Sequence, residues 1–168
     1  MGIMDKLNRW VENVRAVVDF QPQVGIVLGS GLGAFGDRIQ VETVLPYSEI
    51  EGFPISTVNG HKGRYLFGWL EGVPVVVMQG RVHYYEGYTM EDVVLPIRLM
   101  GRLGVGILLL TNAAGSVNLD YHPGEFMLIR DHISSFVPSP LIGPNAETLG
   151  TRFPDMTAVY DPQLCELI

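Results

Sequence analysis

The N-terminal stretch carries apolar residues at the spacing of one helix face. Between residues 4 and 19, Leu7, Trp10 and Val14 recur at intervals of three and four among charged side chains. This pattern predicts an amphipathic surface helix that buries one face. Pro22 is expected to end the helix, because proline cannot donate a backbone hydrogen bond.

Short apolar runs then predict the strands of a sheet. Residues 24 to 28 lead directly into glycines, which is typical of a buried strand that feeds a tight loop. Residues 64 to 70 and 73 to 79 are rich in aromatic and β-branched side chains. Glu71 and Gly72, the two residues between these runs, predict a hairpin turn.

A second helical pattern leads from the hairpin to another apolar run. Thr89 followed by Glu91 and Asp92 is typical of a helix start, and an apolar stripe continues to Leu103. Residues 105 to 110 then predict a buried strand. Since a helix between two strands of one sheet makes a crossover, the strands before and after it are expected to run parallel.

The last third of the sequence is less regular. Residues 126 to 129 predict one further strand, and from about residue 136 the chain is rich in Pro, Gly and polar residues, which favours a long functional loop or a subunit contact. A final helix is expected after Asp161-Pro162. Together these patterns predict one α/β domain over residues 1 to 168, with a central mixed, largely parallel twisted sheet flanked by helices.

Composition narrows the classes of function. The 168 residues are 47% hydrophobic and 17% charged, which is typical of a packed α/β protein. The formal net charge of -7 argues against nucleic acid as a partner, because such binding depends on clustered Lys and Arg. Any bound anion should therefore be small and held by a few converging groups. A single cysteine, Cys165, and the lack of an apolar stretch typical of a signal peptide or a membrane span favour the cytoplasm.

Glycines and polar side chains cluster directly after three of the predicted strands. They occupy residues 29 to 33, 80 to 86 and 111 to 115. Ligands of open α/β sheets bind beyond the carboxyl ends of the strands. We therefore expect the three segments to converge on one site.

The glycine-rich segment after the first strand admits three interpretations. Its backbone N–H groups and the Ser30 hydroxyl could hold phosphate, or its glycines could simply form a tight turn. The spacing Gly29-x-Gly31-x-x-Ala34 also resembles a dinucleotide fingerprint. The long amphipathic helix that a dinucleotide site needs does not follow, because Gly36 and residues 41 to 45 interrupt it.

The segment after the hairpin offers an anion clamp. Arg81 and His83 lie two residues apart on chain expected to be extended, so their side chains can share a face. A guanidinium is a planar fork of donors for phosphate oxygens, and an imidazole adds a further donor. Glu86 could orient either residue, Tyr85 could contact a sugar, and His61 is a possible extra ligand. Taken alone, each of the five could be an ordinary loop or surface residue, but the position of Arg81 and His83 after a core strand favours a functional role.

Seven motifs follow one another along the chain: Gly29-Ser30-Gly31-Leu32-Gly33, Gly60-His61, Gln79-Gly80-Arg81-x-His83-x-Tyr85-Glu86-Gly87-Tyr88, Thr111-Asn112-Ala113-Ala114-Gly115, Arg130-Asp131-His132-Ile133, Gly143-Pro144-Asn145 and Arg152-Phe153-Pro154. In this combination and order they resemble the trimeric purine nucleoside phosphorylases. They extend from about residue 24 to the end of the sequence, and the resemblance implies the nucleoside phosphorylase type of α/β fold.

The resemblance implies a role for each candidate residue. Phosphate would contact Ser30, His61, Arg81, His83 and the backbone N–H of Ala113. His83 and Glu86 would be catalytic, Tyr85 and Phe153 would bind ribose, and Ala113 and Ala114 would lie beside the purine. Phe153 would reach the site of a neighbouring protomer, which implies a homotrimer. Inorganic phosphate would be a co-substrate, and no metal or organic cofactor would be needed.

The resemblance leaves alternatives open. Family members continue beyond residue 168, and their purine-recognising residues lie in that later part, so this chain is expected to be truncated and its fold incomplete. It could then be an inactive fragment that serves as a phosphate-binding or assembly module. A methylthioadenosine phosphorylase would share the fold and the phosphate clamp. Asn112-Ala113-Ala114 is closer to the purine nucleoside branch, which favours inosine and guanosine as substrates. A dehydrogenase is the remaining alternative.

Overall fold

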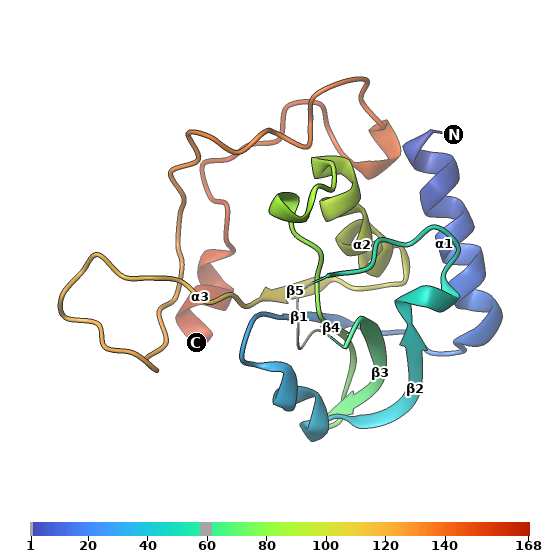
Figure 1. Cartoon of the computed structure of the whole chain (residues 1–168), viewed down its shortest axis with the longest axis horizontal. Coiled ribbons are helices and arrows are strands. Elements are labelled where there is room, and N and C mark those ends of the chain that lie inside the picture. Colours follow the sequence, from blue (N-terminus) through green and yellow to red (C-terminus); the bar gives the residue numbers. More distant parts are fainter. Residues whose placement is uncertain (1, 58–61) are drawn as a thin grey trace. The chain divides into compact units, whose positions relative to one another are not determined.

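A computed structural model describes residues 2 to 57 and 62 to 168, so His61 lies outside the described residues. The chain divides into two compact units, Met1–Ala113 and Ala114–Ile168. The described residues of the first unit form a five-stranded sheet and two α-helices, and those of the second form one short α-helix (Figure 1).

The first helix forms as its apolar stripe predicts. Helix α1 covers Ile3–Val17 and buries Leu7, Trp10 and Val14. It ends ahead of Pro22, because Val18 is already extended. Arg15 holds the chain beyond this end, donating from one guanidinium nitrogen to the carbonyl of Phe20 (2.9 Å) and from the other to that of Leu103 (2.7 Å).

The sheet is mixed and has the order β2-β3-β4-β1-β5. Its strands are β1 (Val24–Leu28), β2 (Gln40–Pro46), β3 (Arg64–Leu70), β4 (Val73–Gln79) and β5 (Ile107–Leu110). Strand β1 runs parallel to both β4 and β5, whereas β3 runs antiparallel to β2 and β4. The predicted hairpin and the predicted parallel crossover are therefore confirmed. Strand β2 was not expected, since its residues were interpreted only as an interruption after the glycine loop.

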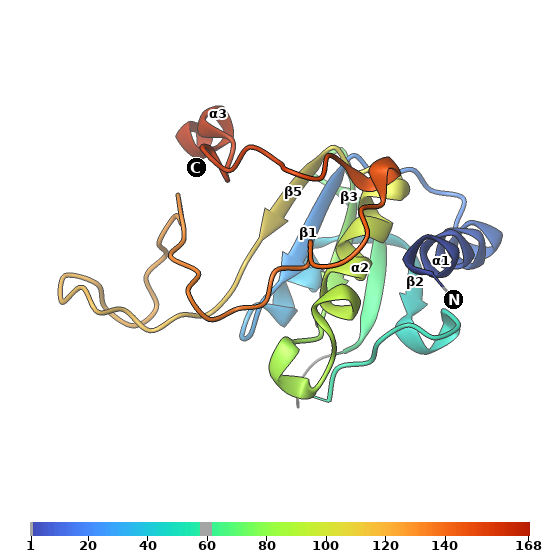
Figure 2. The ribbon, with the colours of Figure 1, turned by 90° about the horizontal axis from the view of Figure 1, so that it is seen from above.

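Helix α2 covers one face of the sheet. It extends over Met90–Arg102, and the Thr89 hydroxyl caps it by accepting a hydrogen bond from the Asp92 N–H at 3.1 Å, as the sequence predicts. The end of the Met100 side chain packs on Gly25 of β1, and the Tyr65 hydroxyl of β3 donates to the Pro96 carbonyl at 3.1 Å. Figure 2 shows α2 against the strands, with α1 farther out.

The opposite face buries an aliphatic cluster. Its buried members come from β1, β3, β4 and the segment before β2: Ile26, Leu28, Ile39, Leu66, Val75 and Val77. The register places Ile26 beside Val77 and Val77 beside Leu66, so the cluster crosses three adjacent strands. Burial on both faces explains why β1 and β4 read as continuous apolar runs.

Strand β5 differs from its prediction in burial. The sequence predicts a buried strand, but the four residues Ile107–Leu110 are 37% to 49% exposed. Successive side chains of a strand point to opposite faces, so neither face of β5 is fully covered. The reason is its place at the edge of the sheet, where β1 is its neighbour in the strand order.

The second unit is mostly irregular. A 3-10 turn covers Glu147–Leu149, and α3 covers Pro162–Leu167 with Asp161 as its cap, which confirms the predicted final helix. The predicted strand at residues 126 to 129 is wrong, because these residues form no ladder. An apolar run becomes a strand only when another strand pairs with it, and the described residues of this unit contain none. No helix among the described residues has the length and apolarity needed to cross a membrane.

Two glycine substitutions should change stability in opposite directions. A Cβ at Gly68 of β3 would collide with the backbone oxygen of Gln40 in β2, so Gly68→Ala should lower the free energy of unfolding by about 1–3 kcal/mol. Gly101 of α2 is exposed, and a Cβ there would meet nothing within 4 Å. Gly101→Ala should therefore raise the free energy of unfolding by about 0.5–1 kcal/mol. Urea unfolding measures both. A neutral Gly68→Ala would mean that β2 and β3 are not packed as described.

Candidate anion-binding site

Three loops leave the same edge of the sheet. Because β1, β4 and β5 are parallel, their carboxyl ends meet there, with Leu28 beside Gln79 and Val27 beside Leu110. The loops that follow begin at Gly29, Gly80 and Thr111. The predicted convergence of these three strand ends is thus confirmed.

Thr111 joins all three loops. Its hydroxyl accepts a hydrogen bond from the Gly29 N–H at 2.8 Å and donates to the Val27 carbonyl at 2.9 Å. Its own carbonyl accepts from the Arg81 guanidinium at 2.7 Å. A Cβ on Gly29 would lie 2.6 Å from that carbonyl oxygen, so only glycine permits this approach. The sequence placed Thr111 within a motif but did not reveal this connecting role.

Ser30 lies at the tip of the glycine turn. The Leu32 N–H donates to the Gly29 carbonyl at 3.1 Å, which closes the turn around Ser30 and Gly31. Gly31 has φ of 85°, a left-handed conformation that favours glycine. Ser30 is exposed, and a short 3-10 helix, η1 (Gly33–Arg38), follows instead of the long helix of a dinucleotide site.

Arg81 and His83 are in contact, as their spacing predicts. The Arg81 Nε donates to His83 Nε2 at 3.4 Å, while its Nη1 is held by Thr111. Burial lowers the pKa of the Arg81 guanidinium from its usual value, and the neighbouring Tyr85 acts in the opposite direction. An arginine keeps its charge in proteins, so a half-buried positive charge lies at the carboxyl edge of the sheet.

Glu86 orients His83. Its Oε1 lies 2.8 Å from His83 Nδ1 and also accepts from the His83 backbone N–H at 2.8 Å. Nδ1 of the ring therefore faces the Glu86 carboxylate and Nε2 faces Arg81, so the ring is held between these two side chains. The carboxylate side chain is only 2% exposed.

The second oxygen of Glu86 holds a loop from elsewhere in the chain. Oε2 accepts from the Thr57 N–H at 2.6 Å, from the Thr57 hydroxyl at 2.9 Å and from the Ser56 hydroxyl at 3.2 Å. Burial alone would raise the pKa of Glu86, but hydrogen bonds from Thr57 and His83 outweigh it and lower the pKa to about 2. Glu86 is therefore a carboxylate at neutral pH. Sequence reasoning missed Ser56 and Thr57, since nothing local links them to a residue about 30 positions away.

The other predicted site residues lie at the surface, in the second unit or outside the described residues. Tyr85 is 74% exposed and stacks on His83 with ring centroids 4.8 Å apart, and Ala113 is exposed at the end of the first unit. Ala114 and Phe153 belong to the second unit, where Phe153 is 85% exposed. His61 lies outside the described residues. The sugar and purine contacts assigned to these residues remain predictions.

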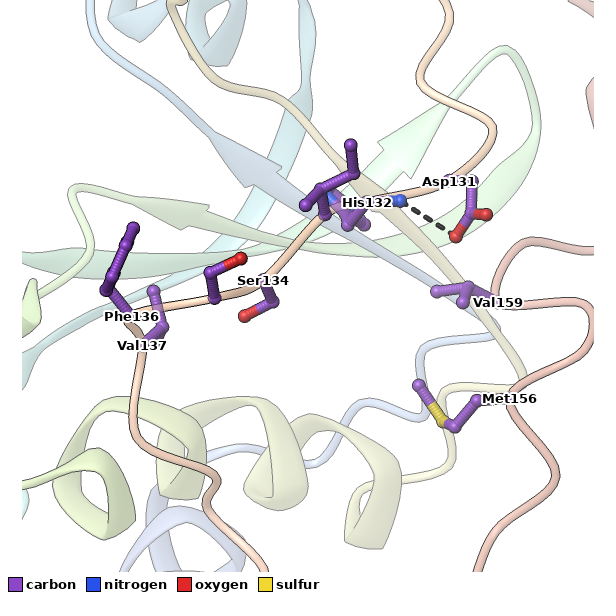
Figure 3. A pocket seen from close by; sticks show the side chains of 9 residues that line it. Asp131, His132, Ser134, Phe136, Val137, Met156 and Val159 are labelled. Atoms are coloured by element: carbon purple, nitrogen blue, oxygen red, sulfur yellow. Dashed lines mark hydrogen bonds between the residues drawn. The ribbon is translucent and has the colours of Figure 1, made fainter.

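A separate hollow of about 630 Å³ lies within the second unit. Residues 131 to 137, Met156 and Val159 line it, and the His132 N–H donates to Asp131 Oδ1 at 2.8 Å (Figure 3). None of the predicted site residues that the structure describes is part of this lining. The cluster of Arg81, His83 and Glu86 therefore shares no residue with the lining of this hollow.

Comparison with known proteins agrees with this geometry. Residues 23 to 168 match the family model described as the phosphorylase superfamily. The chain belongs to the phosphorylase superfamily. Within this superfamily, it is 53% identical over 146 residues to purine nucleoside phosphorylase 1 of Geobacillus stearothermophilus, which covers 87% of this chain and 53% of that protein. Purine nucleoside phosphorylase 1 of Bacillus subtilis is 47% identical over 163 residues, covering 97% of this chain and 60% of that protein.

A solved structure extends the likeness to the fold. The structure of Schistosoma mansoni purine nucleoside phosphorylase in complex with inosine has a TM-score of 0.89 and 40% identity, and the match covers 98% of this chain and 58% of that one. The mixed α/β sheet of this superfamily is thus confirmed, as is the resemblance to purine nucleoside phosphorylases. The chain spans 53% to 60% of the length of these three relatives.

Glu86→Gln should destabilise the chain, and more at neutral pH than at acid pH. Because the pKa of Glu86 is lowered from 4.5 to about 2, its charge contributes stability that is present above about pH 4.5 and lost as the pH falls toward 2. A glutamine would turn an amide NH2 toward donors, so the expected loss is about 1–3 kcal/mol at pH 7 and less at pH 3. Urea unfolding at both pH values measures it.

The matched control is Glu91→Gln, which removes an exposed carboxylate. It should change the free energy of unfolding by no more than about 0.5 kcal/mol. An equal loss for Glu86→Gln at pH 7 and pH 3 would contradict the role given to the Glu86 charge.

Proposed function

We propose that this chain carries the phosphate-binding half of a purine nucleoside phosphorylase active site. The reaction is the reversible phosphorolysis of purine ribonucleosides and 2′-deoxyribonucleosides, such as inosine and guanosine, to free base and (deoxy)ribose 1-phosphate. This places the protein among pentosyltransferases of purine salvage. The observation that carries the proposal is the cluster of Arg81, His83 and Glu86 at the edge where three parallel strands end.

The relatives support the choice of substrate. Those cited above are named purine nucleoside phosphorylases; the Schistosoma mansoni enzyme has been solved with inosine, and a Schistosoma enzyme has been solved with hypoxanthine. Ser30 and Gly31 on the glycine turn add a hydroxyl and backbone N–H groups to the guanidinium of Arg81. A dianion of the size of phosphate suits this donor set, since guanidinium and backbone N–H groups both bind phosphate oxygens.

In the proposed reaction phosphate attacks the anomeric carbon as the purine leaves. The sugar then develops positive charge, and an anion already held beside it stabilises that charge and is positioned to form the new bond. Arg81 and His83 hold the phosphate, and Glu86 keeps the His83 ring in one orientation. His83 and Glu86 are the residues on which we expect the chemistry to depend most.

The remaining assignments complete the proposal. Phosphate would also contact Ser30, His61 and the Ala113 N–H, ribose would contact Tyr85 and Phe153, and the purine would lie beside Ala113 and Ala114. Phe153 would serve the site of a neighbouring protomer in a cytoplasmic homotrimer. Phosphate is the co-substrate, and the scheme uses no metal or organic cofactor.

Arg81→Ala should chiefly impair the use of phosphate. The chain spans 53% to 60% of the length of the two bacterial relatives, so the assay uses residues 1 to 168 joined to the C-terminal remainder of the Geobacillus stearothermophilus relative. Loss of one charged donor pair should remove about 2–4 kcal/mol of transition-state stabilisation. This corresponds to a fall in kcat/KM for phosphate of roughly 30- to 1000-fold. Hypoxanthine release from inosine, followed against phosphate concentration, measures this.

Arg9→Ala is the matched control, because Arg9 forms an exposed ion pair with Glu51 at 3.3 Å. It should leave the kinetics unchanged.

A chimera that releases no hypoxanthine would contradict the proposed activity, and preference for methylthioadenosine would favour the related phosphorylase. Unchanged phosphate kinetics in Arg81→Ala would make Arg81 a structural residue. Residues 1 to 168 alone should release little hypoxanthine.

A further inference from the structure

Tyr47 lies outside the residues assigned to phosphate but binds the backbone that leads to them. Its hydroxyl donates to the Gly80 carbonyl at 2.7 Å. That carbonyl and the Arg81 N–H belong to the same planar peptide unit. The hydroxyl therefore holds the peptide from which the Arg81 side chain projects.

Gly80 needs such a restraint from outside. It has φ of 100°, in the left-handed region that glycine adopts readily, and glycine has no side chain to limit rotation of its peptides. On one side of it, Gln79 is 2% exposed and donates to the Gly33 carbonyl at 2.6 Å. On the other side, the Arg81 guanidinium is already engaged with Thr111. The bond from Tyr47 fixes the unit between these two anchored residues.

Tyr47 is itself held firmly. It begins a 3-10 turn, η2 (Tyr47–Glu49), is 1% exposed, and packs its ring against Phe53 at 4.8 Å and Tyr65 at 5.1 Å between centroids. Its backbone N–H donates to the Gly63 carbonyl at 2.9 Å. Burial, with a smaller effect of Tyr65, raises the pKa of Tyr47 well above its usual value, so the hydroxyl keeps the proton that it donates.

We propose that Tyr47 is a positioning residue of the anion-binding site, whose buried hydroxyl fixes the Gly80–Arg81 peptide and thereby the direction of the Arg81 guanidinium. The identity of the anion as phosphate rests on the proposed function. The positioning itself does not, because the hydrogen bond joins two residues of this chain.

A purely structural role predicts a different outcome, and Tyr65 provides the comparison. Tyr65 is 0% exposed, and its hydroxyl donates to the Pro96 carbonyl of α2 at 3.1 Å. The two tyrosines thus make the same kind of buried hydrogen bond to a backbone carbonyl. Only that of Tyr47 reaches the residue before Arg81.

The experiment compares Tyr47→Phe with Tyr65→Phe in the chain of residues 1 to 168. Each variant keeps its ring and loses one hydroxyl, so both should lower the melting temperature to a similar extent. Phosphate binding, titrated by phosphorus NMR with inorganic phosphate, should weaken about tenfold in Tyr47→Phe and by less than about twofold in Tyr65→Phe. Amide hydrogen exchange at Arg81, measured without phosphate, should speed up only in Tyr47→Phe.

The outcomes separate the positioning role from the proposed function. Equal phosphate affinity in wild type and Tyr47→Phe, or equal weakening in both variants, would overturn the positioning role. Unchanged exchange at Arg81 in Tyr47→Phe would overturn it as well. A wild-type chain that does not bind phosphate, with exchange at Arg81 still faster only in Tyr47→Phe, would contradict the phosphate site and leave the positioning role supported.

Discussion

The parallel pairing of β1 with both β4 and β5 is the constraint on which the site depends. It brings together three strand ends that are separated by up to about 80 residues in sequence, with Leu28 beside Gln79 and Val27 beside Leu110. The loops that carry Ser30, Arg81, His83 and Ala113 begin at this edge. A shift of one strand by one residue would exchange its two faces and move Gln79 or Thr111 away from the loop that each one binds.

Many polar side chains at this edge form hydrogen bonds with main-chain groups. Thr111, Gln79 and Tyr47 each bind a main-chain group of a loop, namely the N–H of Gly29 and the carbonyls of Gly33 and Gly80. These loops are rich in glycine, which gives their backbone many possible conformations. Hydrogen bonds from the buried side chains hold them in one conformation. Glu86 does the same for the His83 ring and for Thr57. A site of this kind is preorganised by residues that need not touch the ligand.

The sequence predicted elements whose cause is local. Glu71 and Gly72 adopt φ of 49° and 78°, the positive values that a two-residue hairpin turn requires, and Thr89 caps α2 with its hydroxyl. The Arg81 and His83 contact followed from a spacing of two on extended chain. In each case the pattern and its physical cause lie within a few residues.

Features with a non-local cause were missed or predicted wrongly. Strand β2 has few buried residues and was overlooked, and the apolar residues 126 to 129 remained without a partner strand. The bonds from Thr57 to Glu86 and from Tyr47 to Gly80 connect residues about 30 positions apart, so no local pattern announces them. Burial of β5 also depends on neighbours in space, which the apolar run at residues 105 to 110 does not reveal.

The most direct test of this account is the position of a bound anion. Crystals of the chain grown with arsenate, which mimics phosphate and is located by its anomalous scattering, would show where the anion lies. The account predicts arsenate in hydrogen-bond contact with the Arg81 guanidinium and the Ser30 hydroxyl, beside His83. The account would be contradicted if arsenate bound only elsewhere, for example against residues 131 to 137, while water alone bound the Ser30 hydroxyl and the Arg81 guanidinium.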